Sequence, residues 1–170
     1  KNKVKMGAVC STDSGAAKVA KGALAQGDSY KGDVEEGLPN GKGTLKSKSG
    51  SIYIGQFRSG KKHGKGKQDF PNGDSYNGEW ENDTMQGKGT YTESKGDVYE
   101  GDFEKGQRNG HGTLTHTSGR VYTGEFRKGA KAGYGKLTIS DTETYEGDFV
   151  DNEIEGTGTY HYPSGDVLKG

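Results

Sequence analysis

The sequence predicts an all-β fold made of stacked β-hairpin repeats. A tyrosine recurs every 23 residues from Tyr30 to Tyr145, and a glycine follows each of these tyrosines two positions later. A fixed period of this size is typical of repeat arrays, in which each unit contacts only its neighbours. A residue that recurs in every unit is therefore expected to be structural, and functional sites are sought where the units differ.

The composition favours such an array over a globule with a thick core. Hydrophobic residues make up 26% of the 170 residues, and glycine occupies 32 positions. So little apolar surface alone would indicate disorder, because its burial does not offset chain entropy. The strict period, the ten tyrosines and the five phenylalanines indicate instead that neighbouring units stack on one another. One hairpin is marginal in water, so several units are needed for stability.

Each unit has the pattern of two antiparallel strands. The fourth unit carries Tyr99, Gly101 and Phe103 at a spacing of two, followed by Gly110 and Gly112. A spacing of two is the strand period, so these residues share one face and the polar residues between them share the other. The pattern predicts one strand from the tyrosine to the phenylalanine and a returning strand through the glycine pair. Glycine lacks a Cβ, so an aromatic ring of the adjacent strand can lie flat against it.

The connections between units carry the residues that turns require. Pro71-Asn72-Gly73 and Pro163-Ser164-Gly165 place proline where φ is near −65° and glycine where φ is positive. The fifth unit has Thr142 at the glycine position, so we expect an altered or strained turn there. Val34 and Trp80 stand at the phenylalanine position in the first and third units.

These residues resemble the MORN (membrane occupation and recognition nexus) repeat family, whose unit is a hairpin with Tyr-x-Gly-x-Phe and Gly-x-Gly signatures. The resemblance implies an elongated, single-layer, twisted antiparallel sheet with an aromatic groove. It places the array over residues 27–170, after an N-terminal arm at residues 1–26. This arm is a degenerate first repeat or, from a weak helical spacing, a mobile or helical segment. The array has the start of a seventh unit after six full units at 30–52, 53–75, 76–98, 99–121, 122–144 and 145–167.

Catalytic and metal-binding residues do not occur at suitable spacings. The four histidines, His63, His111, His116 and His161, lie in different units at different registers, and the single cysteine, Cys10, is remote from them. No Ser/His/Asp or Cys/His arrangement can be placed on one surface. We therefore predict no enzyme, no metal and no cofactor. The resemblance implies a non-catalytic scaffold or adaptor for a partner protein, cytoplasmic and associated with the cytoskeleton or a cilium.

The aromatic face is the main candidate site. No second layer covers a single-layer sheet, so we expect much of this face to stay open, and open apolar surface usually marks a partner site. The groove would receive a helix or an extended peptide. Trp80 is the expected hot spot, with Tyr91 and Tyr160 on the returning strands. The predicted contact set is Tyr53, Phe57, Tyr76, Trp80, Tyr99, Phe103, Tyr122, Phe126, Tyr145 and Phe149.

A peripheral membrane adaptor is the alternative function. Residues 6–11 fit the N-myristoylation pattern, with Gly7 as the acceptor and Cys10 placed for palmitoylation, but five residues precede Met6 and an internal glycine is not acylated. Two acyl chains together would give stable attachment. The second unit is also basic, and it either binds anionic lipid or an acidic partner or is simply a solvated loop. The residues of this basic cluster are Arg58, Lys61, Lys62, His63, Lys65 and Lys67.

The charges divide the chain into two halves. Residues 1–75 carry 14 Lys/Arg and 7 Asp/Glu, a sum of +7, and residues 76–170 carry 10 and 17, a sum of −7. Ends of opposite charge and an open sheet edge both favour self-association, although drift among solvated loops is an equally simple explanation. The total charge of zero argues against a nucleic-acid partner.

Overall fold

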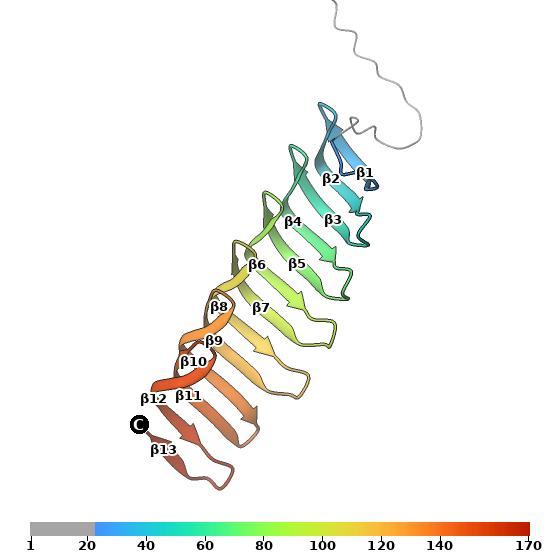
Figure 1. Cartoon of the computed structure of the whole chain (residues 1–170). Coiled ribbons are helices and arrows are strands. Elements are labelled where there is room, and N and C mark those ends of the chain that lie inside the picture. Colours follow the sequence, from blue (N-terminus) through green and yellow to red (C-terminus); the bar gives the residue numbers. More distant parts are fainter. Residues whose placement is uncertain (1–22) are drawn as a thin grey trace, which may run out of the picture.

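The computed structural model describes residues 23–170, which form one sheet of thirteen antiparallel strands. Each strand pairs with the next one along the chain, so the hairpins lie side by side in a long twisted ribbon from β1 to β13 (Figure 1). The described residues contain no helix, and the predicted hairpin array is confirmed. The strands are β1 (Ser29–Glu35), β2 (Leu38–Lys46), β3 (Ile52–Arg58), β4 (Lys61–Asp69), β5 (Ser75–Glu81), β6 (Thr84–Thr92), β7 (Val98–Glu104), β8 (Gln107–Thr115), β9 (Val121–Arg127), β10 (Ala130–Ser140), β11 (Glu143–Val150), β12 (Glu153–His161) and β13 (Val167–Lys169).

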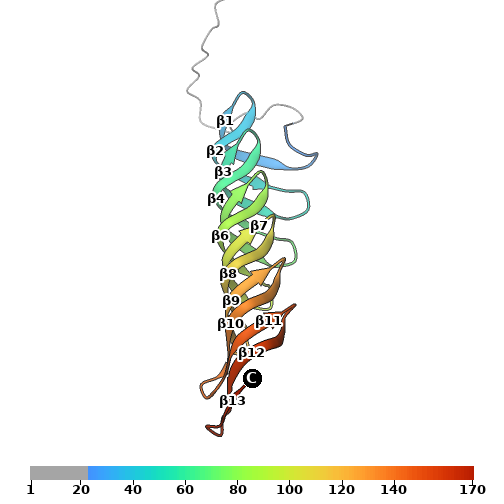
Figure 2. The ribbon, with the colours of Figure 1, turned by 90° about the vertical axis from the view of Figure 1, so that its left-hand side faces the viewer.

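A β-bulge interrupts the pairing inside every hairpin. In the second unit Gly55 is opposite Gly66, but Phe57 is opposite Lys62, so three residues of β4 face one residue of β3. The first glycine of each Gly-x-Gly pair lies in this bulge, and Gly64 has a φ of 63° there. The bulge bends the hairpin across the ribbon, as the side view of Figure 2 shows. The sequence pattern had predicted a returning strand without this interruption.

Two-residue turns close the hairpins at one long side of the ribbon. Both residues of each turn have positive φ, as a type I′ turn requires. In the second unit Ser59 and Gly60 have φ of 48° and 82°, and in the third unit Asn82 and Asp83 have 49° and 67°. The second turn residue also donates its backbone N–H to the preceding unit, as from Gly60 to the Pro39 carbonyl at 2.8 Å. Each turn is therefore fastened to the unit before it.

The connections between units are the turns that the sequence predicted, with one altered. In the turn after β4 the Gly73 N–H donates to the Phe70 carbonyl at 3.0 Å, and Gly73 has a φ of 90°. In the fifth unit β10 runs on to Ser140, whose register partner is Glu143. The predicted alteration at Thr142 is confirmed, but Thr142 avoids strain because it does not adopt a positive φ.

The predicted arm lies mostly outside the described residues. Residues 1–22 are not described, and they include Gly7, Cys10 and most of the segment with helical spacing. The lipidation sites therefore stay predictions.

Candidate partner-binding groove

The tyrosine of each unit lies flat over two glycines. A Cβ added to Gly66 or Gly55 would overlap the Tyr53 ring, so only glycine leaves room for the ring. The tyrosine hydroxyl then reaches past the glycines and donates to a backbone carbonyl, from Tyr53 to Gln56 at 2.9 Å. Tyr76 makes the same bond to its own unit at 2.9 Å. The predicted function of the glycines is confirmed, and the hydroxyl bond explains why this position is tyrosine.

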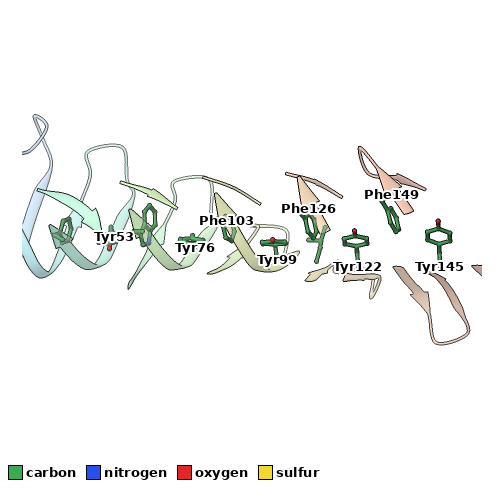
Figure 3. Packing of buried hydrophobic residues seen from close by; sticks show 11 residues of the cluster. Tyr53, Tyr76, Tyr99, Phe103, Tyr122, Phe126, Tyr145 and Phe149 are labelled. Carbon is green, nitrogen blue, oxygen red and sulfur yellow. The ribbon is translucent and has the colours of Figure 1, made fainter. Parts of the chain in front are cut away.

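The phenylalanines come from the other side of the bend and meet the tyrosines edge to face. Figure 3 shows the two rows facing each other, and the Tyr76 and Phe103 ring centroids are 4.9 Å apart at 76°. Each phenylalanine touches the tyrosine of its own unit and that of the unit before, so Phe103 also lies 5.2 Å from Tyr99. Trp80 continues the row, and its indole N–H donates to the Gly66 carbonyl at 3.0 Å. The rings form one continuous aromatic ladder along the array.

The expectation that this face stays open is wrong for the ten predicted contact residues. All ten are buried, and Tyr76, Tyr99 and Tyr122 are 0% exposed. The bulge is the physical reason, because it folds the phenylalanine half of each hairpin over the tyrosine half. Burial also raises the pKa of Tyr76 and Tyr99 to about 12. Partner binding by this set stays a prediction, and surface contacts must come from the residues around the ladder.

A column of cations covers the ladder in the second, fourth and fifth units, and the third unit interrupts it. Pro39 and Ile154 stand at the same position in the first and sixth units. Lys62 Nζ lies 4.3 Å from the Trp80 ring centroid. Arg108 and Lys131 lie 5.1 and 5.3 Å from the tyrosine rings of their own units. Desolvation by burial lowers the pKa of Lys62 and Lys131. Met85 occupies the same position in the third unit, so an uncharged, adaptable side chain separates two cations.

Two adjoining hollows flank Met85 on this side of the sheet. Their volumes are about 370 and 210 Å³, and both are lined by Met85 and Gly106. Lys62 lines the smaller hollow, and Arg108 and Lys128 line the larger. Tyr91 and Trp80, which line these hollows, were predicted as contact residues from the sequence, but Met85 was not. The signal for Met85 was available in the sequence, because its unit lacks the cation that the second, fourth and fifth units carry at this position. The apolar part of the lining is Phe70, Trp80, Met85, Tyr91 and Phe103.

A family model described as MORN repeat matches six segments of the chain, at residues 30–52, 53–75, 76–98, 99–119, 122–143 and 145–167. The chain belongs to the MORN repeat family. A search of curated proteins finds no match for the chain. MORN repeats are a non-enzymatic scaffold type that generally mediates interactions with proteins or lipids. The fifth MORN match ends at residue 143, the first residue after the altered turn.

The MORN fold divides the predicted basic cluster between two sides of the sheet. Lys62 lies over the aromatic ladder, and Lys65 and Lys67 are exposed strand residues on the opposite face. Arg58 and Lys61 pair directly across the hairpin beside its turn. The six residues therefore do not form one patch, because alternate residues of a strand point to opposite faces.

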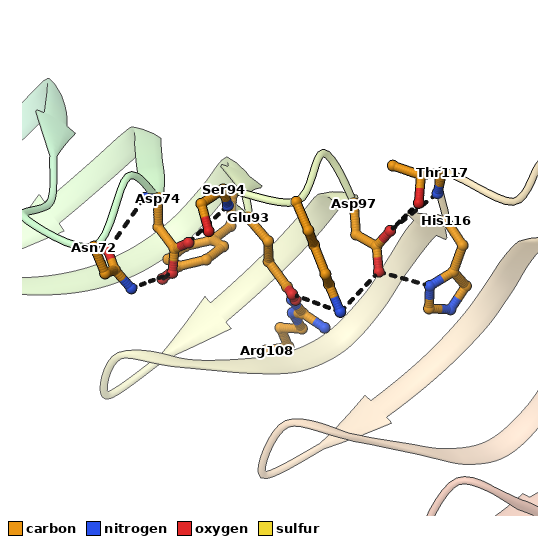
Figure 4. A network of polar contacts seen from close by, with 10 residues as sticks. Asn72, Asp74, Glu93, Ser94, Asp97, Arg108, His116 and Thr117 are labelled. Atoms are coloured by element: carbon orange, nitrogen blue, oxygen red, sulfur yellow. Dashed lines mark hydrogen bonds and ion pairs between the residues drawn. The ribbon is translucent and has the colours of Figure 1, made fainter.

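Polar links between the MORN units were not found in the sequence. Asp97 is only 4% exposed, and its carboxylate accepts bonds from the Thr117 N–H at 2.9 Å and from His116 Nδ1 at 2.8 Å (Figure 4). These bonds and Lys95 hold the pKa of Asp97 well below its usual range. Asp74 makes the equivalent bond to the Ser94 N–H at 2.8 Å. An acidic residue two positions before the repeat tyrosine, present in four of the six units, was the available signal: Asp28, Asp74, Asp97 and Glu143.

Residues 23–170, the part of the chain that the structure describes, have two further properties. No helix there has the length and apolar character to cross a membrane. No group of three or more His, Cys, Asp or Glu side chains in that part of the chain is arranged to hold a metal ion.

Proposed function

We propose that this chain is a non-catalytic scaffold that binds a helix or peptide of a partner protein over the two hollows beside Met85. The observation that carries the proposal is the interruption of the cation column at Met85, directly above buried rings. Apolar hollows with a few charged residues at their rim are the usual form of peptide-binding sites. The buried ladder holds the lining rigid, so little ordering cost is added when a partner binds.

Both signs of charge line the hollows, since Asp74, Asp83 and Glu93 stand beside Lys62, Arg108 and Lys128. Within residues 23–170 the two lysines form no ion pair, so they favour a partner with an apolar anchor and an acidic flank. Arg108 is occupied by Glu93, with an Nη2–Oε1 distance of 2.9 Å. Lys128 is exposed at the rim, and Lys62 has a neutral bond partner in Gln68. An apolar side chain would contact Met85, and a carboxylate would reach one of these lysines. We place this interaction in a cytoskeletal or ciliary assembly, as an inference from the range of MORN proteins.

Affinity capture with a charged substitution tests the groove. Met85→Glu places a carboxylate in the hollows and is expected to abolish capture of the partner. Thr123→Glu adds the same charge to an exposed position of the opposite face and should leave capture unchanged. Trp80→Ala is unsuitable here, because Trp80 is a buried part of the ladder. Capture of the same partners by Met85→Glu, with unchanged circular dichroism, would refute the groove as the binding site.

The cellular setting is tested by identifying the partner proteins that the unchanged chain captures and the Met85→Glu variant does not. Proximity labelling in cells followed by mass spectrometry identifies them. The cytoskeletal or ciliary setting requires that proteins of those assemblies dominate this difference. If they do not, the setting is wrong while the groove stands.

The alternative function is peripheral membrane attachment, and the exposed Arg58–Lys61 pair at the hairpin end is the observation that favours it. Two exposed like charges face each other there without a carboxylate between them, as at a surface for anionic lipid. Flotation with phosphatidylserine vesicles tests this. Gly7→Ala or Lys61→Glu should reduce flotation, and unchanged flotation of the double variant would exclude the membrane adaptor.

A further inference from the structure

The face opposite the aromatic ladder carries a row of shallow hollows floored by glycine. The hollow across β1–β4 has a volume of about 680 Å³ and is floored by Gly32, Gly43 and Gly55. Two further hollows along the same face measure about 410 and 470 Å³. A Cβ on any of these glycines would point into a tyrosine ring on the ladder face, so the floor of the hollow is bare backbone. The character of the channel depends on the polar residues at its sides.

The residues at the sides of the largest of these three hollows are basic and apolar. Lys31, Lys42 and Lys65 line it, and Ile54 lies opposite Thr44 on the strand between those of Lys42 and Lys65, with 57% of its surface exposed. Within residues 23–170 no carboxylate lines this hollow, and none of the three lysines forms an ion pair. The next hollow along the face is different, because Glu79 and Glu100 line it.

Gln56 makes this hollow positive without changing the fold. Its position precedes the phenylalanine of the unit, and it caps the bulge by accepting the Lys65 N–H at 2.8 Å. Asp102 performs the same task in the fourth unit, where it accepts the His111 N–H at 3.1 Å. The amide therefore keeps the structural hydrogen bond and omits the negative charge. The other five units have a carboxylate at this position: Asp33, Glu79, Asp102, Glu125 and Asp148.

We propose that this hollow binds an extended acidic segment of a protein, with an apolar side chain on Ile54 and carboxylates at Lys42 and Lys65. The two lysines stand two strands apart, about 9.6 Å at the usual strand spacing. Side chains two positions apart share a face of an extended chain, and four residues cover about 13 Å, so the segment needs two carboxylates four positions apart with an apolar residue midway. The flexible lysine and glutamate side chains take up the remaining difference in length. Asp33 and Glu79 lie beyond the two lysines and limit the positive region to this length. This site is separate from the groove beside Met85 and does not depend on it.

Titration of the isotopically labelled full chain with a synthetic peptide tests the proposal. The probe is Gly-Ser-Glu-Ser-Leu-Ser-Glu-Ser-Gly with blocked ends, and the readout is the NMR shift of the Ile54 methyl group. We expect saturable shifts that weaken as salt is raised. Gln56→Glu should weaken binding by at least about fivefold, because the new carboxylate repels those of the peptide. The fold should survive this change, since five other units carry a carboxylate there.

The controls separate this site from charge in general and from the groove. Thr123→Glu adds an equal charge further along the same face, and Met85→Glu alters the groove, so both should bind the peptide as the unchanged chain does. A peptide with glutamine in place of both glutamates should not bind. The proposal fails if Gln56→Glu binds equally well or if the neutral peptide binds as tightly. It also fails if Ile54 responds to phosphatidylserine vesicles and not to the peptide.

Discussion

At the scale of single residues, the contact between tyrosine and glycine determines which side chains the array accepts. Gly89 has an ordinary strand conformation, yet a Cβ there would overlap the Tyr76 ring. Gly119 is the opposite case, because its φ of 86° is left-handed but nothing lies within 4 Å of an added Cβ. Glycine therefore recurs at these two positions of the repeat for different reasons. Gly89 leaves space for the tyrosine ring, and Gly119 adopts the left-handed backbone conformation.

Gly89→Ala is expected to lower the free energy of unfolding by about 2–3 kcal/mol, because an inserted methyl group forces a packed ring aside. Gly119→Asn should change it by less than about 1 kcal/mol, since asparagine adopts the left-handed conformation readily. Urea denaturation of both variants measures the difference. An equal decrease in the free energy of unfolding for both variants would show that the contact between Gly89 and the Tyr76 ring contributes little to stability.

The same scale shows what the sequence pattern could not reveal. The spacing of two placed the tyrosine, glycine and phenylalanine correctly on one face. It could not show that Gln56 and Asp102 cap a bulge, because a polar residue on a wet face has the same pattern whether or not it bonds to backbone. It also could not show that Phe103 folds over Tyr76, since the spacing of two does not show that a bulge bends the hairpin.

At the scale of elements, the turns between hairpins are joined to one another by carboxylates. Asp97 connects the turn before β7 to the turn after β8 through His116 and Thr117 (Figure 4). The fifth unit has a different turn and Arg120 at the position equivalent to Asp97. The carboxylate link between successive turns is therefore made by Asp28, Asp74 and Asp97, and the second and fifth units have no carboxylate at this position.

Asp97→Asn is expected to lower the melting temperature at neutral pH, because it removes a negatively charged acceptor of three bonds. The folded pKa of Asp97 is depressed, so its stabilisation is present above the unfolded pKa of about 3.9 and is lost as pH falls toward the folded pKa. The melting difference between the chain and the variant should thus be largest above about pH 5 and shrink below about pH 4. Asp141→Asn, in an exposed turn, serves as the control. A difference that does not depend on pH would rule out the charge of Asp97 as the cause.

At the scale of the whole molecule, stability depends on the continuity of the aromatic ladder. Trp80 lies 5.3 Å from Tyr53 and 5.2 Å from Tyr76, so it joins the second unit to the third. Arrays of this kind are stabilised by contacts between neighbours and have no common core. A break in the middle should therefore separate the two parts.

Trp80→Ala is expected to lower the free energy of unfolding by about 3–5 kcal/mol, the usual effect of removing a buried aromatic ring. Hydrogen exchange should then show residues 30–75 losing protection while residues 99–144 keep most of theirs. Trp80→Phe restores the ring found in other units and loses only the indole bond to Gly66, about 1 kcal/mol. A uniform loss of protection along the chain would mean that the array unfolds as one unit.

The overall architecture could be predicted because the repeat fixes both strand pairing and stacking order. The site could not be predicted to the same extent. A period shows which residues recur, but it does not show whether a face of recurring residues is covered by its own bend. Met85 and Gln56, the residues on which the two binding proposals rest, depart from positions that the 23-residue period aligns, but the contacts that give those positions meaning appear only in the folded sheet.

The backbone bonds from each turn to the unit before it give the array a direction of growth. The acceptor carbonyls of Pro39, Lys62 and Met85 belong to the earlier unit, and the donor N–H groups belong to the later one. A ribosome adds about 5–20 residues per second, so a unit of this length emerges in roughly 1–5 s. A hairpin closes in about 1–10 μs. We therefore expect each unit to fold against a finished template during synthesis, well before the next one is made.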